Sequence, residues 1–299
     1  MSPVTQLFVE MIGFQLPRDI ALTIVIPMYC ESARIGPTLE DIAQTLGGGD
    51  LAAEVVVVDD GSTDDTLAVA EAAGERLFGD QSMVDFVCKP QERNRGKGAA
   101  VRAGLEASRG DWVLMMDADN SARLRELPKL LEATGDGHTG MVVGSRSMPE
   151  SEIEARVLRR VAGIAFRSAV QVMGMRFVTD SQCGFKLYRC DAAKLCSEYG
   201  VEDGFAFDLE HLGLCNKQGI GIKEVGIAWV HSPNGTVSVF SDGVRMLLRC
   251  FAIRDRLKRL VISSREFERD RAASMIEMKL PQSGDGVGAE SVLSASAGS

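Results

Sequence analysis

The sequence predicts an α/β fold in which helices cover both faces of a doubly wound, mostly parallel β-sheet. Strand-like and helix-like segments alternate through the first 150 residues, which is the order of βαβ units. Branched apolar residues dominate the segments 22–27 and 54–58, as is typical of parallel strands buried on both faces. Polar residues directly follow three strands, at 29–31, 59–62 and 117–119. They predict a polar edge at the carboxyl ends of the strands, where open α/β sheets bind ligands.

The first half of the chain predicts five strands with helices between them. The first helix, 32–46, ends at the glycine run 47–49, and the third, 100–108, follows Gly96-Lys97-Gly98. The second helix runs to about residue 77, with Ser62 or Thr63 as a natural N-cap and two aspartates that suit its positive end. The five strands are expected at 22–27, 54–58, 84–89, 112–116 and 141–144.

The pattern changes after residue 150. A long, basic and apolar helix is expected at 153–178, and a basic amphipathic helix at 242–262. Between them we expect strands at 185–188 and 222–229 and helices at 191–199 and 208–218. The resulting division is a lead-in at 1–20 with a short helix ending near Pro17, a first half at 21–150, a second half at 151–262 and an extension at 263–299. The extension is rich in Gly, Ser and Ala, so disorder is expected after about residue 282.

Composition excludes several classes of protein. The 299 residues are 45% hydrophobic and 25% charged, as in an ordinary globular protein. The net charge of -9 argues against a general nucleic-acid binder. The seven cysteines form no Cys-x-x-Cys pair, which favours buried or half-buried thiols in a reducing cytosol. We see neither a secretory signal nor a run of about 18 apolar residues that spans a membrane.

The most informative feature is Asp117-Ala118-Asp119, at the end of the apolar segment 112–116. Side chains alternate along a strand, so the two carboxylates point the same way if the extended geometry continues. Such hard oxygen ligands suit Mg²⁺ or Mn²⁺ held between the protein and the phosphates of a substrate. Many turns also carry an Asp-x-Asp, so this pattern gains its weight from the other two polar strand ends.

Five ordered runs of this sequence resemble the family 2 glycosyltransferases of the GT-A fold. The runs are IVIPMYCE, VVVVDDGSTDDT, RGKGAAVRAG, MMDADN and VVGSR. Two later runs, DSQCGFKLY and GFAFDLEHL, are similar to those of the dolichyl-phosphate (polyprenyl-phosphate) β-glucosyltransferases, with the dolichyl-phosphate mannose synthases as near cousins. The resemblance covers roughly residues 20–255 and implies a nucleotide-sugar donor and a polyprenyl-phosphate acceptor.

The resemblance implies a donor site at the polar edge of the sheet. Asp60 would accept the N–H of a uracil ring, and Asp119 would ligate the cation directly. Asp117 would ligate the cation too, or hold the ribose or a metal-bound water. Two of these residues have a simpler alternative role. Ser62 could serve only as a helix cap, and Lys97 could be a solvated lysine at the start of a helix. The expected donor contacts are Pro27, Tyr29, Glu31, Asp60, Ser62, Lys97, Asp117, Ala118, Asp119 and Gln182.

The sugar and acceptor sites are implied by later residues. Asp180 and Gln182 would line the sugar pocket, and Asp180 and Asp208 are the expected catalytic carboxylates. Asp208 would be the base for a hydroxyl acceptor; with an anionic phosphate it would only position the sugar, and a helix cap is a third possibility. The expected contacts to the acceptor phosphate are Arg146, Arg160, Arg167 and His231. His231 could instead bind the metal, or it could be an ordinary polar histidine in a loop.

Three positions depart from the family pattern. Cys30 stands where relatives usually have Asn, and Ser121 replaces a third metal ligand of the mannose synthases. Val237 stands where relatives have Lys. The last two substitutions leave open the alternative that the chain is a nucleotide-sugar-binding protein without catalytic activity.

Two basic segments predict contact with a membrane. Residues 155–176 carry five arginines and no acid, and residues 243–260 carry five arginines and Lys258 against Asp255 alone. Basic amphipathic helices lie in the plane of the interface and are attracted to anionic lipid. Packing of these helices on the core or on a second subunit is the alternative.

The leading hypothesis is a metal-dependent, inverting transferase, peripheral at the cytosolic face of a membrane. It would move a hexose, expected to be glucose from UDP-glucose, onto a polyprenyl phosphate. The alternatives are a GDP-mannose-dependent mannose synthase, a soluble family 2 transferase with a hydroxyl acceptor, and a non-catalytic nucleotide-sugar-binding protein.

Overall fold

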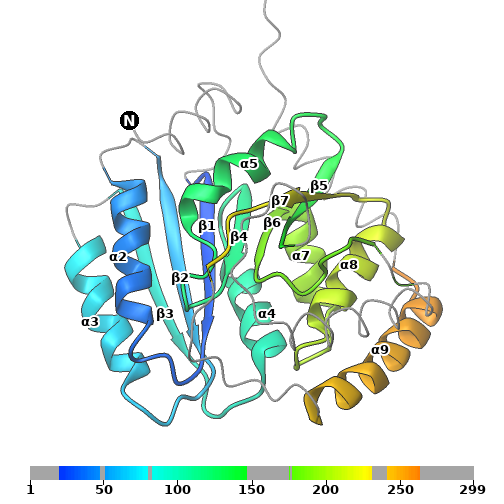
Figure 1. Cartoon of the computed structure of the whole chain (residues 1–299), viewed down its shortest axis with the longest axis horizontal. Coiled ribbons are helices and arrows are strands. Elements are labelled where there is room, and N and C mark those ends of the chain that lie inside the picture. The colour runs from blue at the N-terminus through cyan, green and yellow to red at the C-terminus, as the bar shows by residue number, and fades with distance from the viewer. Residues whose placement is uncertain are drawn as a thin grey trace, which may run out of the picture.

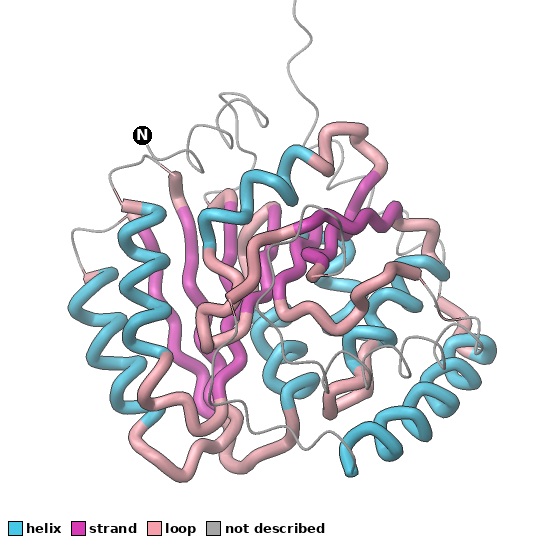
Figure 2. The backbone as a smooth tube through the Cα atoms, in the orientation of Figure 1, coloured by secondary structure: helices cyan, strands magenta, loops and turns pink. Residues whose placement is uncertain are grey.

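One seven-stranded sheet organises the protein (Figures 1 and 2). The computed structural model describes residues 20–47, 51–79, 83–146, 175, 177–230 and 241–262. The strand order is β3-β2-β1-β4-β6-β5-β7. The strands are β1 (Leu22–Met28), β2 (Ala53–Asp59), β3 (Val84–Pro90), β4 (Trp112–Met116), β5 (Thr139–Ser145), β6 (Phe185–Arg189) and β7 (Gly221–Gly226).

The first four strands are parallel and doubly wound, as the sequence predicts. Helices α2 (Ile35–Leu46) and α3 (Thr66–Phe78) pack together on one side, and α4 (Lys97–Ala107) packs against β1 and β2 on the other. This arrangement follows from right-handed crossovers, because the chain moves outward from β1 to β3 and then returns across the sheet to β4. The order of strands reverses between β1 and β4, so their carboxyl ends form a crevice for a ligand.

The second half continues the same sheet with one reversed strand. β6 runs antiparallel to both β4 and β5, and β7 is parallel to β5. The helices here are α7 (Cys190–Tyr199), α8 (Phe207–Lys217) and α9 (Ser241–Arg259). Because β6 runs antiparallel to β4, with Phe185 opposite Met116, residues just before β6 reach the carboxyl end of β4. The mostly parallel α/β sheet of the prediction is confirmed.

The core lies on both faces of the sheet. Every residue of β1, β2, β4, β5 and β6 is buried, whereas the edge strand β3 is largely half-buried. The buried carboxylate of Glu54 on β2 accepts hydrogen bonds from Thr23 Oγ1 at 2.9 Å and Arg109 Nε at 2.7 Å. These partners explain how an ionised side chain is tolerated in the sheet interior.

The prediction that Ser62 or Thr63 is the N-cap of the second helix is wrong. α3 begins at Thr66 with Asp65 in the N-cap position. Ser62 instead accepts the N–H of Cys30 at 2.9 Å and bonds to Asp59, so its hydroxyl is used to join the ends of β1 and β2. Asp64 accepts the backbone N–H of Thr66 at 3.2 Å, which orders the turn that leads into the helix.

Other boundaries differ by a few residues. The first helix begins at Ile35 rather than at 32, and β7 ends at Gly226 rather than at 229. The sequence prediction missed a short 3₁₀ helix, η1 (Leu124–Glu126), and the six-residue α5 (Leu127–Glu132), in which Pro128 stands in the first turn. Both are too short to give a helical periodicity.

Part of the prediction falls on residues outside the described ranges. The lead-in helix, the extension from 263 onward and most of the expected helix 153–178 are in this category. Where that helix is described, at 175 and 177–178, the backbone is not helical. α9 confirms the second basic helix.

None of the seven cysteines, all of which lie in the described ranges, forms a disulfide, and only Cys30 is exposed, contrary to the expectation that each is at least half-buried. Among the described residues, the structure has no helix with the length and apolar character needed to cross a membrane.

Candidate active site

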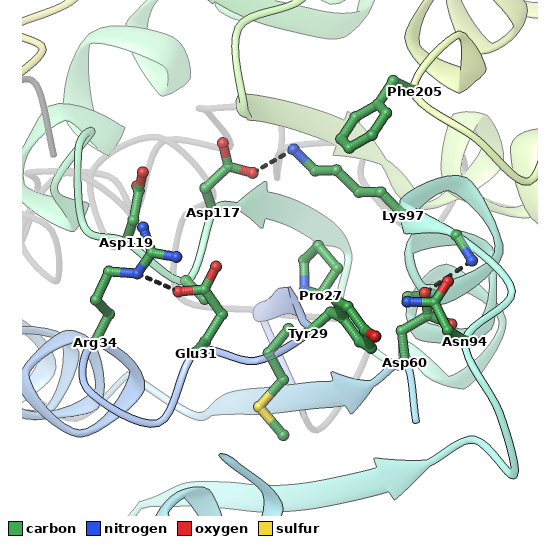
Figure 3. Close-up of a pocket in the computed structure, with 14 residues that line it drawn as sticks. Pro27, Tyr29, Glu31, Arg34, Asp60, Asn94, Lys97, Asp117, Asp119 and Phe205 are labelled. Atoms are coloured by element: carbon green, nitrogen blue, oxygen red, sulfur yellow. Dashed lines mark hydrogen bonds and ion pairs between the residues drawn. The ribbon is translucent and has the colours of Figure 1, made fainter. Parts of the chain in front are cut away.

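A pocket of about 410 Å³ opens at the carboxyl ends of β1, β2 and β4 (Figure 3). The loops that follow these strands and the start of α4 supply most of its wall. Eight of the predicted donor residues line it together: Pro27, Tyr29, Glu31, Asp60, Lys97, Asp117, Ala118 and Asp119. The prediction missed Met28, Arg34, Asn94, Ala100 and Phe205, and named Gly96 only as part of a glycine loop.

One end of the pocket is acidic. Glu31, Asp117 and Asp119 point toward the same space in Figure 3. Burial raises the pKa of Glu31, and the nearby charges of Asp119 and Asp117 raise it further, although the ion pair with Arg34 opposes both. Such an end attracts cations.

Asp117 is held by a loop from the second half of the chain. Its backbone N–H donates to the carbonyl of Gly184 at 3.1 Å. A Cβ atom on Gly184 would lie only 2.0 Å from Asp117 Oδ2, so no larger residue fits against this carboxylate. The Gly of the run DSQCGFKLY therefore has a direct packing role at the pocket.

Asp117 and Asp119 can hold a divalent cation that a substrate also ligates. The described residues contain no group of three or more His, Cys, Asp or Glu side chains arranged to hold a metal by themselves. Mg²⁺ commonly uses one or two carboxylates together with substrate phosphates and waters, so two carboxylates fit such an ion. Asp119 Oδ1 also accepts the N–H of Ser121 at 3.0 Å, which fixes its orientation. The buried hydroxyl of Ser121 has no hydrogen-bond partner in the structure.

The opposite end of the pocket is built around Asp60. In Figure 3, Pro27 and Tyr29 lie between the acidic end and the side chains of Asp60 and Asn94. The two carboxylate oxygens of Asp60 accept the backbone N–H groups of Arg95 and Gly96, each at 2.8 Å. Burial raises the pKa of Asp60, and these two bonds oppose the rise. Each oxygen retains a lone pair for a donor on a ligand.

A loop that precedes α8 closes over the glycine run 96–98. Gly96 has a φ of 111° and lies against the carbonyl of Asp203, where a Cβ would come within 2.3 Å. Arg102 forms an ion pair with Asp203, and Glu210 accepts the N–H groups of Val201 and Glu202, each at 2.8 Å. This loop delivers Phe205, 45% exposed, to the pocket. The aromatic residue Phe205 within the run GFAFDLEHL was the sequence feature that could have identified this pocket residue.

Asp208 does not line the pocket. It is buried in α8, with Oδ1 2.6 Å from Lys186 Nζ of β6. Burial raises the pKa of Asp208, and the positive charges of Lys186 and Lys97 oppose the rise. No side-chain cap begins α8, so the helix-cap alternative for Asp208 is wrong.

Arg146 and Asp180 bind each other. Arg146 Nε and Nη2 donate to the two oxygens of Asp180 at 2.8 and 2.9 Å, and the Arg146 N–H adds a third bond at 3.0 Å. The guanidinium also lies 5.5 Å from the ring centre of Trp229. Glu224 accepts the backbone N–H of Asp180 at 2.8 Å. The pair therefore joins the end of β5 to the loop that carries Asp180.

The remaining predicted residues are not among the described residues that line this pocket. Gln182 has a buried Nε2 atom without a hydrogen-bond partner. Ser62 joins β1 to β2, as described above. Arg160, Arg167 and His231 lie outside the described residues, as does Val237. The residue before His231 is placed near the acidic end, since Val230 N–H donates to the carbonyl of Ser121 at 2.9 Å.

Comparisons with known proteins agree on the class of this chain. The family described as Glycosyl transferase family 2 matches residues 23–196. A "Dolichyl-phosphate beta-glucosyltransferase" of Dictyostelium discoideum is 29% identical over 249 residues, covering 80% of this chain and 75% of that protein. The Saccharomyces cerevisiae protein of the same name is 31% identical over 248 residues, covering 76% and 72%.

A solved structure shows the same fold. The Mycobacterium tuberculosis glucosyl-3-phosphoglycerate synthase in complex with Mn²⁺, UDP-glucose and phosphoglyceric acid aligns with a TM-score of 0.60 and 20% identity. The alignment covers 86% of this chain and 85% of the synthase. At this identity the likeness establishes the fold, which is the GT-A-like α/β fold.

Proposed function

Because this chain belongs to glycosyltransferase family 2 and is related to dolichyl-phosphate β-glucosyltransferases, we propose that it transfers glucose from UDP-glucose to a polyprenyl phosphate, with inversion, at the cytosolic face of a membrane. The observation that carries the proposal is the two-ended pocket. It offers carboxylates for a metal-bound diphosphate at one end and Asp60 for a base N–H at the other.

The donor would lie along this pocket. Asp60 would accept a uracil N–H, which is a charge-assisted contact. Pro27 and Tyr29 would pack against the nucleoside, between the two ends. Asp117 and Asp119 would hold Mg²⁺ or Mn²⁺, which stabilises the departing diphosphate as a Lewis acid. Ala118, between them, lines the pocket without adding bulk.

The sugar would lie beside the loop that carries Asp180 and Gln182. The Asp180 carboxylate is fixed by Arg146, and the Gln182 Nε2 atom is a donor without a partner in the structure. Arg146 would meet the acceptor phosphate with the part of its guanidinium that does not bind Asp180. Arg160, Arg167 and His231 remain proposed contacts to the acceptor or the metal.

The environment of Asp208 favours a phosphate acceptor over a hydroxyl acceptor. A hydroxyl must lose a proton when it attacks, so its transferase needs a base within reach. Asp208 is buried, contacts Lys186 at 2.6 Å and does not line the pocket. A phosphate is already an anion and can attack the anomeric carbon without a base. We therefore assign Asp208 a positioning role.

The described part of α9 supports a membrane location. Helix α9 lies at the margin of the molecule in Figure 1. Leu248 and Phe251 of this helix are exposed, and so are its basic residues Arg249, Lys258 and Arg259. Cys250 and Ile253 are buried against the core. This combination suits a helix lying in the plane of an anionic interface.

The test is nucleotide release by the full chain with Mn²⁺. UDP-glucose, UDP-GlcNAc, UDP-galactose and GDP-mannose are each tried with and without a short polyprenyl phosphate. The proposal expects UDP release from UDP-glucose that requires the lipid and disappears in Asp119→Ala. Asp85→Ala, which removes an exposed carboxylate on β3, is the matched control and should release UDP normally. Lipid-dependent GDP release would favour a mannose synthase, and transfer only to a hydroxyl acceptor would overturn the proposal.

A further inference from the structure

Lys97 is bound to one of the two carboxylates that would hold the cation. Its Nζ atom lies 2.6 Å from Asp117 Oδ1, and in Figure 3 it reaches across the pocket toward this oxygen. Both side chains are partly accessible, with exposed fractions of 24% for Lys97 and 35% for Asp117. Asp117 Oδ1 itself has almost no exposed surface, so this oxygen is covered at the wall of the pocket.

The charges around Lys97 keep it positively charged. A lysine side chain is ordinarily charged at neutral pH, and the Lys97 ammonium group is paired with the Asp117 carboxylate at 2.6 Å. A cation that binds Asp117 must therefore either displace a positive ammonium group or bind beside it. Either event costs electrostatic free energy as long as Lys97 has no other anionic partner.

The base of the Lys97 side chain is fixed, whereas its end can move. Lys97 is the first residue of α4. The glycines on each side pack against the backbone of the loop 202–204, so the start of the helix cannot shift. The flexible stem lies near Phe207, with Nζ 6.0 Å from the ring centre. A diphosphate in the pocket would offer Nζ a second anion within reach of the same stem.

We propose that Lys97 makes the binding of the divalent cation depend on the nucleotide diphosphate. Without a donor, its ammonium group occupies Asp117 and weakens binding of the cation. With a donor, Lys97 turns to the diphosphate and releases the Asp117 oxygen. The inference rests on the proposed function, because it takes Asp117 and Asp119 as the cation ligands. It adds an order to the reaction cycle, in which the cation is bound tightly only together with the donor.

The experiment measures Mn²⁺ binding to the full chain, by electron paramagnetic resonance of free Mn²⁺, with and without UDP. No turnover is involved. In the wild type, UDP should tighten Mn²⁺ binding by roughly 10-fold or more, within the usual range of coupling between sites. In Lys97→Met, which keeps the stem and loses the charge, Mn²⁺ alone should bind about 10-fold tighter than in the wild type. UDP should then tighten Mn²⁺ binding by a clearly smaller factor than in the wild type, because only the direct ligation of the cation by the diphosphate remains. Because coupling is reciprocal, the effect of Mn²⁺ on the affinity for UDP should fall by the same factor.

A second ion pair of the same kind supplies the control. Lys223 Nζ lies 2.8 Å from Asp136 Oδ2, away from the pocket, so Lys223→Met should bind Mn²⁺ and UDP like the wild type. If Lys97→Met binds Mn²⁺ alone no more tightly than the wild type while both bind it with UDP, the inference about Lys97 fails and the metal site stands. If none of the three proteins binds Mn²⁺ with or without UDP, both the proposed metal site and the inference about Lys97 fail.

Discussion

Lys186 Nζ lies 2.6 Å from Asp208 Oδ1 inside the protein, on the strand β6 and the helix α8. The Lys186 side chain has no exposed surface, and its ammonium also donates to the carbonyl of Cys183. Removing one partner of a buried ion pair leaves an uncompensated charge, whereas removing both charges is often tolerated. The pair therefore joins α8 to the loop that supports Asp117, and each charge depends on the other.

The first prediction concerns this pair. Lys186→Met and Asp208→Leu should each lower the free energy of unfolding by about 3–5 kcal/mol, and the double variant should lose less than either single variant. Urea denaturation at pH 7 measures all four proteins. The double variant should also keep measurable lipid-dependent UDP release, because a phosphate acceptor needs no base. Complete loss of release in a folded double variant would restore Asp208 as a required catalytic group.

The second prediction concerns the contact between Gly184 and Asp117. Gly184→Ala places a methyl group where only 2.0 Å separates it from Asp117 Oδ2, so the carboxylate must move. Displacing a group that orients a metal ligand typically costs 10–100-fold in metal affinity or activity, and we expect a loss of about that size in Mn²⁺ affinity measured with UDP present. Gly36→Ala is the control, since its nearest contact would be Val69 Cγ1 at an ordinary 3.8 Å. Unchanged Mn²⁺ affinity in Gly184→Ala would show that Asp117 is not a ligand.

The sequence alone does not predict the contacts Lys186–Asp208 and Gly184–Asp117, whereas it does predict the pocket itself. The pocket could be predicted because parallel strands bring their carboxyl ends together, so acids that follow β1, β2 and β4 in sequence must meet in space. The resemblance to a family then assigned expected roles to Asp60, Asp117 and Asp119, which do line one pocket.

The remaining features depend on long-range pairs. Lys186 alternates with apolar residues in a short strand, a pattern that predicts an exposed side chain, and only the position of Asp208 on α8 explains its burial. Phe205 reaches the pocket because Arg102 and Glu210 hold its loop, and neither contact follows from spacing in the sequence. The reversed direction of β6, which brings Gly184 to Asp117, is likewise a tertiary result.

The third prediction concerns pH and the Arg146–Asp180 pair. Burial on its own would raise the pKa of Asp180, but the bonds to Arg146 outweigh it and hold the pKa below its ordinary 3.8. A lowered pKa in the folded state adds stability above the unfolded value of about 3.8, and that stability is lost as the pH falls through the lower folded value. In Arg146→Met, burial remains and the stabilising charge is gone, so the pKa of Asp180 should rise above 3.8.

The stability difference between the two proteins should therefore depend on pH. Near neutral pH, Arg146→Met should be less stable than the wild type by roughly 2–3 kcal/mol, the size of hydrogen bonds to charged groups. The difference should shrink as the pH falls toward about 4, because Asp180 is protonated earlier in the variant and no longer carries a buried charge. Denaturant titrations across this range measure it. Arg76→Met, which removes an exposed ion pair with Glu40, should show a small difference. A difference for Arg146→Met that does not change with pH would contradict the assigned pairing.

The last prediction concerns the outer side of α9. Leu248 is 67% exposed and Phe251 54% exposed, whereas Cys250 and Ile253 on the same helix are buried. The basic residues Arg249, Lys258 and Arg259 of the same helix are exposed too. Apolar insertion and attraction of about 1 kcal/mol for each basic residue near an anionic surface would act together on this face.

The full chain should therefore float with vesicles that contain anionic lipid and should bind less to neutral vesicles or at high salt, since such attraction is screened. Leu248→Glu with Phe251→Glu should abolish flotation and lipid-dependent UDP release, while UDP affinity stays unchanged because α9 does not line the donor pocket. Met83→Glu, at an exposed apolar residue beside β3, is the control and should float normally. If the double α9 variant floats as well as the wild type, this face does not contact the membrane, and packing against a second subunit becomes the explanation to test by analytical ultracentrifugation.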